Sequence, residues 1–151
     1  MVKKIFLLVL SLVLSLLLVE LMLRLVLPQS DKFFVWQPNL QHTFYPDSSI
    51  LYGIHGPSTF TINSQGFRGD EFKNDNTKKY LCIGGSTTEC LYLDDTEKWA
   101  ALLQDSLNSK GNNKYTIGSV GKCGCTTRDN YIQRKYYAPQ LDKIEGVLLL
   151  V

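Results

Sequence analysis

The chain has 151 residues, of which 44% are hydrophobic and 20% are charged, and its formal net charge at pH 7 is +2. This length is sufficient for one domain with a modest core. Because 16 basic residues are nearly balanced by 14 acidic ones, the charge does not indicate a nucleic-acid-binding surface, and no nucleic-acid partner is expected.

Residues 5–27 form an almost continuous apolar stretch, interrupted only by Ser11, Ser15, Glu20 and Arg24. As a helix this stretch would extend roughly 34 Å at about 1.5 Å per residue, enough to cross a hydrocarbon core of about 30 Å. Glu20 and Arg24 are four positions apart, so they share a helix face on which they can pair. We therefore expect residues 5–27 to contact a lipid bilayer, with residues 1–27 as an N-terminal transmembrane anchor that Pro28 ends.

The charges around this stretch predict its orientation. Lys3 and Lys4 precede it, whereas Asp31 and Lys32 beyond it offset one another. The positive-inside rule then predicts a cytoplasmic N-terminus and an extracytoplasmic body, in the periplasm or at the cell surface. A cleaved signal peptide is the main alternative, although the stretch is long and no Ala-x-Ala site follows it, since the first alanine is Ala100. A core helix of a soluble protein is a further alternative, which so continuous an apolar run disfavours.

Residues 28–79 are interpreted as an irregular, aromatic-bearing approach segment with Pro and Gly turns. Residues 59–63 alternate like a short strand, and residues 64–66 predict a turn after it. His42 and His55 have no other metal ligand at suitable spacing, so both are interpreted as surface or turn residues. The charged and polar residues 70–79 are interpreted as a linker.

Residues 80–151 alternate between short apolar runs and helical patterns. Strands are predicted over 80–83, 115–120 and 147–151. This order implies right-handed crossovers and a parallel sheet with helices on both faces. The chain stops on the last apolar residue, and an open apolar edge invites aggregation. We therefore expect the 151 residues to be the front part of a longer protein, with a complete small domain as the alternative.

Two helices are predicted between these strands. Asp94 and Glu97 have the spacing of a capping box. They precede a helix that Gly111 ends and whose apolar face would carry Trp99, Leu102, Leu103 and Leu107. The second helix, capped by Thr126 or Thr127, would run until Pro139 and pack through Tyr131, Ile132, Tyr136 and Tyr137.

Ser86 follows the first predicted strand on a turn that begins with Gly84 and Gly85. Ligands of open α/β sheets bind beyond the carboxyl ends of the strands, and a glycine pair leaves space there. Ser86 is therefore a candidate nucleophile, and a purely structural turn is the alternative. A phosphate-binding loop is disfavoured, because the Gly-x-x-x-x-Gly-Lys-Ser/Thr spacing is absent.

From the sequence alone, it is undecided whether any of the four cysteines form a disulfide. Cys82 is interpreted as a small core residue of the first strand. Cys90 lies near the carboxyl end of that strand and could reach Cys123 or Cys125 near the next one. Zinc is disfavoured, because Cys123-x-Cys125 lacks a second pair at structural-zinc spacing. No metal or cofactor is expected.

Three segments resemble the SGNH/GDSL hydrolase superfamily. Residues 83–88, Ile-Gly-Gly-Ser-Thr-Thr, resemble its first block, whose serine is the nucleophile, here Ser86. Residues 119–127 look like its second block, whose first glycine, here Gly121, donates a backbone N–H to the oxyanion. Residues 60–69 are similar to a lead-in of membrane-anchored bacterial members. The resemblance covers about residues 35–151. It implies a flavodoxin-like three-layer α/β/α sandwich with a parallel sheet, incomplete at its C-terminus and preceded by one transmembrane helix.

The resemblance also implies a function. The chain would be the N-terminal part of a membrane-anchored serine ester hydrolase acting on acyl esters, including carbohydrate-linked ones, outside the cytoplasm. The oxyanion asparagine and the catalytic histidine and aspartate of the family would lie beyond residue 151, so this chain alone is expected to be inactive. An O-acyltransferase acting on a cell-envelope polysaccharide is one alternative. The other is a non-catalytic, surface-anchored binding module that uses the aromatic residues 33–52.

Overall fold

The computed structural model describes residues 2–27, 32–111 and 113–150. The chain divides into two compact units, Met1–Asp31 and Lys32–Val151. Three expectations involve residues outside the described ranges: the helix end at Pro28, the charge of Asp31, and Val151 as the last strand residue.

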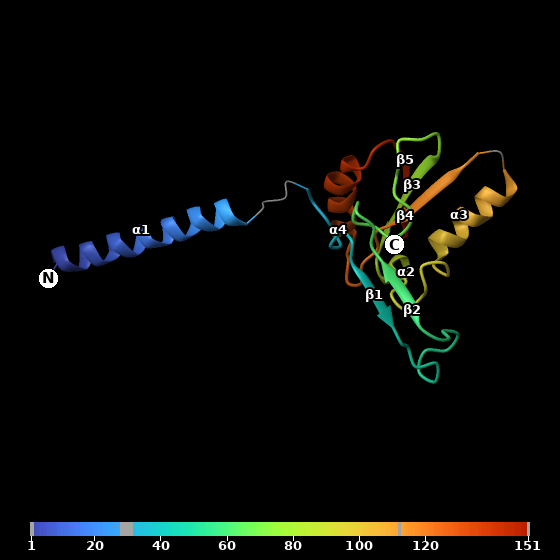
Figure 1. The fold of residues 1–151 in the computed structure, drawn as a ribbon, viewed down its shortest axis with the longest axis horizontal. Coiled ribbons are helices and arrows are strands. Elements are labelled where there is room, and N and C mark those ends of the chain that lie inside the picture. The colour runs from blue at the N-terminus through green and yellow to red at the C-terminus, as the bar shows by residue number, and fades with distance from the viewer. Residues whose placement is uncertain (1, 28–31, 112, 151) are drawn as a thin grey trace. The chain divides into compact units, whose positions relative to one another are not determined.

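The first unit contains α1, an α-helix over Val2–Val26 without a buried residue (Figure 1). The hydroxyls of Ser11 and Ser15 donate to backbone carbonyls of the preceding turn at 2.9 and 2.7 Å, which satisfies them within the helix. Glu20 and Arg24 form the ion pair that their spacing predicts, at 2.8 Å. The helix is long and apolar enough to cross a membrane or to be a signal sequence, so both interpretations remain.

The second unit begins with an antiparallel strand pair. β1 spans Gln41–Phe44 and β2 spans Ser58–Thr61, with Gln41 opposite Thr61. The strand predicted over 59–63 is thus confirmed for most of its length. β1 was not predicted, because its first three residues are polar and exposed and show no apolar alternation. The predicted turn over 64–66 is also present, and Gly66 has a φ of +88° there.

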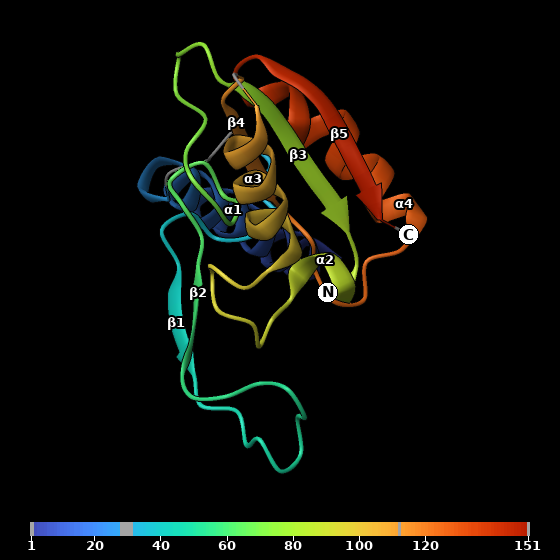
Figure 2. The ribbon, with the colours of Figure 1, turned by 90° about the vertical axis from the view of Figure 1, so that its right-hand side faces the viewer.

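The main sheet has three parallel strands, which confirms the predicted strand–helix alternation. They are β3 over Lys78–Gly84, β4 over Tyr115–Ser119 and β5 over Ile144–Leu150. Their order is β4-β3-β5, so β3 lies at the centre (Figure 2). In register, Leu81 of β3 lies opposite Gly118 on one side and Val147 on the other.

Helices cover both faces of this sheet, as predicted. α3 spans Trp99–Lys110. α4 spans Thr127–Ile132 and continues as the π-helix η1 over Gln133–Tyr137 and the 3-10 helix η2 over Ala138–Gln140. Figure 2 shows α3 on one side of the strands and α4 on the other. The structure is therefore a mixed α/β fold with a parallel three-stranded sheet.

The two core clusters follow from the alternation of side chains along β3. Cys82 packs with Ala100 of α3, whereas Leu81 and Ile83 pack with Tyr137 of η1. Successive strand residues point to opposite faces, so one strand supplies both clusters. Cys82 is fully buried, as predicted, and burial raises the pKa of its thiol to about 12.

The predicted start of α3 is wrong. The helix begins at Trp99, and its cap residue Lys98 makes no side-chain cap hydrogen bond. The carboxylate of Asp94 instead accepts from the backbone N–H groups of Thr96 and Thr59 at 3.1 and 3.0 Å. Asp94 therefore stabilises its own turn and fixes that turn to β2.

Two of the four residues predicted for the apolar face of α3 pack against the core, and two do not. Trp99 and Leu103 pack against the core, but Leu102 is 55% exposed and Leu107 is 36% exposed. Ala100 is buried, so the face of α3 that contacts the sheet consists of Trp99, Ala100 and Leu103.

The second predicted helix is confirmed. Thr126 caps it, the Asp129 N–H donates to the Thr126 hydroxyl, and the Thr126 N–H donates to the Asp129 carboxylate. Tyr137 packs in the core. Tyr131 and Tyr136 do not pack as predicted, since both are more than half exposed.

The predicted linker over 70–79 is confirmed for 70–77, which contain no helix or strand and are mostly exposed, whereas β3 already begins at Lys78. Phe72 is buried and its ring lies 4.6 Å from that of Phe67. Lys79 belongs to β3 and is buried, and its ammonium pairs with Asp75 at 3.1 Å. Charged residues usually indicate solvent exposure, but here a local ion pair allows one lysine to enter the strand.

The two outer edges of the sheet differ. On β4, Asn108 of α3 hydrogen bonds to both backbone groups of Tyr115, and Gln104 accepts from the Ile117 N–H at 2.7 Å. The backbone of Arg68 exchanges two hydrogen bonds of 2.8 Å with Ser119. On β5, the exposed fractions of the last three described residues are 37%, 54% and 41%, at Leu148, Leu149 and Leu150.

Candidate active site

Ser86 is the first residue of α2, a four-residue helix over Ser86–Glu89 that follows β3 directly. Gly84 ends the strand, and a Cβ there would collide with the side chain of Thr88 and lie 2.6 Å from the carbonyl oxygen of Leu150. The helix therefore packs onto the strand end without room for a larger residue. The Ser86 side chain remains exposed, at the carboxyl end of the central strand as predicted.

A cavity of about 380 Å³ lies next to Ser86. One wall is the turn Gly85, Ser86 and Thr87; the others come from the segment 125–127, Asn130 of α4 and Leu150 of β5. The ends of β3 and β5 and the loop after β4 thus meet around one hollow, where ligands of parallel sheets bind.

Asn130 gives this cavity a polar group that sequence reasoning missed. It is 5% exposed, and its side-chain oxygen has no hydrogen-bond partner among the described residues. Buried polar atoms are normally satisfied, so an unsatisfied one on a cavity wall is a candidate ligand contact. The sequence offered no signal for it beyond its position one turn after the Thr126 cap.

Gly121 lies beneath α2 and is not among the residues that line the Ser86 cavity. A Cβ at Gly121 would lie 2.5 Å from the carbonyl carbon of Thr88, so only glycine allows this close approach. The later part of the same loop, Cys125 to Thr127, forms the cavity wall. Donation by the Gly121 N–H to an oxyanion stays a prediction.

Glu89 fixes the loop after β4 to α2. Its carboxylate is buried and accepts from the Cys123 N–H at 2.7 Å. Burial raises the pKa of the Glu89 carboxyl, while the Cys123 hydrogen bond and the charges of Lys122 and Arg68 act in the opposite direction. The contact joins the two segments that carry the predicted site residues, Ser86 and Gly121.

The buried side chain of Arg68 binds the end of α2 and the segment that follows it. The side chain is 1% exposed and forms an ion pair with Asp95 at 2.7 Å. Its guanidinium also donates to three backbone carbonyls of the segment after Ser86, those of Glu89, Cys90 and Leu93, at 2.7 to 3.1 Å. The lead-in 60–69 is thus a structural support for the turn that carries Ser86.

Both tryptophans contact the segments around Ser86. The indole N–H of Trp36 donates to the carbonyl of Gly121 at 2.9 Å, and the Lys122 ammonium lies 4.8 Å from the Trp36 ring centroid. The indole N–H of Trp99 donates to the carbonyl of Thr87 at 3.2 Å. The Trp99 bond fixes the turn that lines the cavity, and the Trp36 bond fixes the loop after β4 at Gly121, before the part of that loop that lines the cavity.

Within the described part of the chain, the cavity lining contains no imidazole, carboxylate or amine. His42 lies on β1 and His55 in the loop after it; both are exposed, as predicted, and neither lines this cavity. Cys125 lines it, but burial raises the pKa of its thiol. The described lining therefore offers hydroxyl groups and other polar contacts, but no imidazole, carboxylate or amine that could act as a general base.

All four cysteines are free thiols, so neither of the two disulfides considered for Cys90 is formed. The thiol of Cys90 donates to the Thr87 carbonyl at 3.0 Å, so it also stabilises the α2 turn.

No family model, curated protein or solved structure matches this chain.

Proposed function

We propose that this chain belongs to a membrane-anchored serine ester hydrolase of the SGNH/GDSL superfamily that acts on acyl esters outside the cytoplasm, with Ser86 as the nucleophile. The observation that carries the proposal is the exposed Ser86 hydroxyl beside a cavity at the carboxyl end of the central parallel strand. The lining of this cavity also includes Asn130, whose buried side-chain oxygen has no partner among the described residues.

The strand order supports the proposed fold. β3, β4 and β5 are the first, second and third parallel strands of the sheet, so the order β4-β3-β5 is 2-1-3 in chain order. A flavodoxin-like sheet has the order 2-1-3-4-5 and binds its ligand at the switch between strands one and three. The Ser86 cavity includes Leu150 of β5, which is at this switch.

The proposed chemistry is acyl transfer through the Ser86 oxygen. The oxygen attacks the ester carbonyl while a base takes its proton, and backbone N–H groups of Ser86 and Gly121 stabilise the oxyanion. Collapse of this intermediate expels the alcohol, which takes up the proton and leaves an acyl-serine. Water then releases the acid. The base must come from outside the described cavity lining, so we expect the 151-residue chain alone not to turn over esters.

The test uses a fluorophosphonate probe, which reacts covalently only with an activated serine. The complete gene product, purified in detergent, should be labelled at Ser86 and should hydrolyse a short aryl ester. Ser86→Ala should abolish the labelling and reduce hydrolysis by at least about 1000-fold. Ser106→Ala, at an exposed serine of α3 that does not line the cavity, is the matched control and should keep the labelling.

Absence of labelling in the folded complete gene product would refute the proposal. Labelling together with acyl transfer to an added sugar hydroxyl, in preference to water, would indicate the O-acyltransferase alternative.

One observation favours the binding-module alternative. The loop between β1 and β2 displays three large apolar side chains, with exposed fractions of 82%, 74% and 90% at Tyr45, Ile50 and Tyr52. Exposed apolar groups in one loop are typical of interaction sites. If fluorophosphonate fails to react, and Tyr45→Ser with Tyr52→Ser abolishes retention on purified cell envelopes, this alternative replaces the hydrolase.

A further inference from the structure

The outer side of α4 and η1 carries two exposed tyrosines around one ammonium. Tyr131 is 60% exposed and Tyr136 is 52% exposed. The ammonium of Lys135, which is also exposed, lies 5.9 Å from the ring centroid of Tyr131 and 5.1 Å from that of Tyr136. These three side chains therefore form one contiguous group, which we call the α4–η1 surface.

The part of the chain that carries this surface is positively charged. Residues 127–140 contain one carboxylate, that of Asp129, and three exposed cations, so their net charge is +2; the cations are Arg128, Arg134 and Lys135. The Asp129 carboxylate accepts from the N–H and the hydroxyl of Thr126 at 2.7 and 2.6 Å. It is thus engaged in the helix cap, and the ion pairs among the described residues include none of the three cations.

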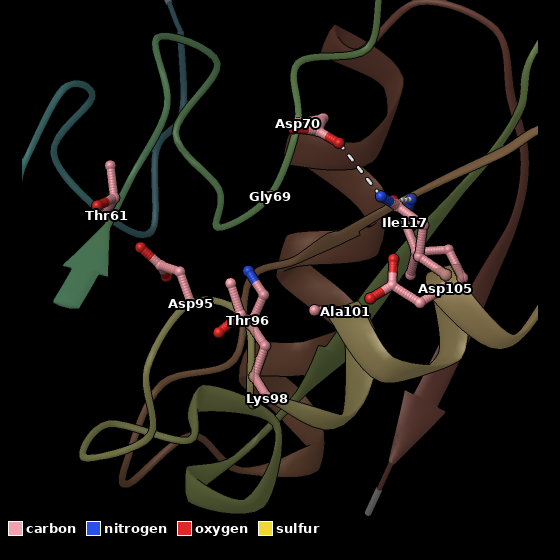
Figure 3. Close-up of a pocket in the computed structure, with 10 residues that line it drawn as sticks. Thr61, Gly69, Asp70, Asp95, Thr96, Lys98, Ala101, Asp105 and Ile117 are labelled. Carbon is pink, nitrogen blue, oxygen red and sulfur yellow. Dashed lines mark hydrogen bonds between the residues drawn. The ribbon is translucent and has the colours of Figure 1, made fainter. Parts of the chain in front are cut away.

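The opposite side of the sheet, which α3 covers (Figure 2), is negatively charged. Residues 94–110 contain two lysines and four carboxylates, so their net charge is −2. A cavity of about 410 Å³ lies on this side, and Figure 3 shows three carboxylates around it, those of Asp70, Asp95 and Asp105. Asp95 is paired with Arg68 at 2.7 Å. None of the described residues that line this cavity belongs to α4 or η1. An anionic surface would therefore attract the α4 side and repel the α3 side.

The helix that carries the α4–η1 surface is bound to the first residues of the second unit. The Phe33 N–H donates to the side-chain oxygen of Gln140 in η2 at 3.1 Å, and the Gln140 amide donates to the Phe33 carbonyl at 3.2 Å. Figure 1 shows the start of this unit beside the helix. Phe33 is six positions after Leu27, and six residues span about 20 Å at full extension. With α1 in a bilayer, the covalent chain therefore holds η2 close to the lipid surface.

We propose that the α4–η1 surface lies on the headgroups of anionic phospholipids, in the bilayer that α1 anchors. Tyrosine is favoured at membrane–water interfaces, because its ring is apolar and its hydroxyl is polar. Lysine and arginine are attracted to anionic headgroups, and the methylene chain of Lys135 can remain against the rings while its ammonium contacts a phosphate. The proposal rests on α1 lying in the bilayer and is independent of the chemistry at Ser86.

The test measures how fast an acetylating reagent modifies individual lysines of the full chain, reconstituted through α1 in nanodiscs. One set of discs contains only phosphatidylcholine, and the other also contains about 30% phosphatidylglycerol. Mass spectrometry should show that Lys135 reacts at least about threefold more slowly on the anionic discs, because headgroups cover it. Lys110, exposed at the end of α3, is the matched control and should react equally on both.

Removal of the two rings tests the aromatic contribution. Tyr131→Ser with Tyr136→Ser should reduce the protection of Lys135, expressed as the ratio of its rates on the two kinds of disc, to less than about 1.5-fold. Tyr45→Ser with Tyr52→Ser, at exposed tyrosines of the loop between β1 and β2, is the control and should leave this ratio unchanged. All four positions are exposed, so loss of folding is not expected.

Removal of charge tests the electrostatic contribution and leaves the reporter lysine in place. Arg128→Gln with Arg134→Gln should reduce the protection of Lys135 to a similar extent, whereas Lys110→Gln should not. Salt at about 0.5 M should abolish the protection in the unchanged chain, because it screens exposed charges.

Several results would overturn the proposal. They are equal reaction of Lys135 on neutral and anionic discs, protection of Lys110 as strong as that of Lys135, and failure of the chain to enter the discs, which would remove the tether. Dextran sulfate, a soluble anionic polysaccharide, is added to the neutral discs as a further arm. If it protects Lys135 while phosphatidylglycerol does not, the surface binds a polysaccharide and the lipid proposal is wrong.

Discussion

The two edge strands of the main sheet differ in how far other parts of the chain cover them. Along β4 the outward backbone groups are satisfied by Asn108 and Gln104 of α3 and by the backbone of Arg68. Along β5 the last leucines are one-third to one-half exposed. Exposed strand edges tend to pair with other chains. The difference shows that a sheet edge can be closed by a few side chains of the preceding helix, without a further strand.

Arg68→Met should have the largest effect next to the β4 edge, because the Arg68 side chain fixes the turn after Ser86, while its backbone bonds to Ser119 of β4 remain. The substitution removes the partner of the buried Glu89 carbonyl, of the half-buried Asp95 carboxylate and of further carbonyls, so we expect a loss of about 3–5 kcal/mol in the free energy of unfolding. Urea unfolding in detergent, followed by tryptophan fluorescence, measures this loss. Arg128→Met, on an exposed arginine, is the control, and an equal effect of both variants would contradict the role given to Arg68.

Ile83→Ala and Leu149→Ala compare two residues that lie opposite each other in register on β3 and β5. Ile83 is fully buried and Leu149 is 54% exposed. We expect a loss of about 2–4 kcal/mol for Ile83→Ala and less than about 1 kcal/mol for Leu149→Ala. The same urea titration measures both. A comparable loss at Leu149 would mean that β5 is covered in the folded protein in solution.

Asn108→Ala should have the smallest effect, because it removes only the two hydrogen bonds to Tyr115, of 2.8 and 3.0 Å. We expect about 1 kcal/mol of destabilisation and faster hydrogen exchange at the amide of Tyr115, measured by mass spectrometry or NMR. Asn113→Ala, at an exposed asparagine, should change neither. Unchanged exchange at Tyr115 would show that the edge does not need this cap.

The element order was predictable because it depends on local patterns. Short apolar runs separated by helical periodicity identified β3, β4 and β5, and the pair Thr126 and Thr127 identified the start of α4, where the cap is Thr126. The start of α3 was not predictable in this way, because Asp94 has capping-box spacing but bonds to Thr59, which is 35 positions earlier. A long-range contact of this kind leaves no periodic signal.

Buried charges are a second feature that the sequence did not predict. Sequence patterns assign charged residues to the surface, yet Arg68, Lys79 and Lys98 are all less than 3% exposed. Arg68 is buried because backbone carbonyls from distant residues surround it. Such a set of acceptors exists only after the chain has folded.

The sequence predicted only part of the candidate site, because only Ser86 lies in a recognisable local pattern. A glycine pair after an apolar strand was enough to place Ser86 at a strand end. Asn130 could not be identified, because its only distinction is that a buried amide oxygen has no partner on a cavity wall.

The indole hydrogen bonds of the two tryptophans also provide a spectroscopic signal. The chain has two tryptophans, and each donates to the backbone of one segment beside the Ser86 cavity, Trp36 to Gly121 and Trp99 to Thr87. Indole emission responds to the polarity around the ring, so a displacement of either segment changes the intrinsic fluorescence. Trp36→Phe and Trp99→Phe would each leave one emitter. Stopped-flow fluorescence would then time the motion of each of these two segments separately, without an added dye.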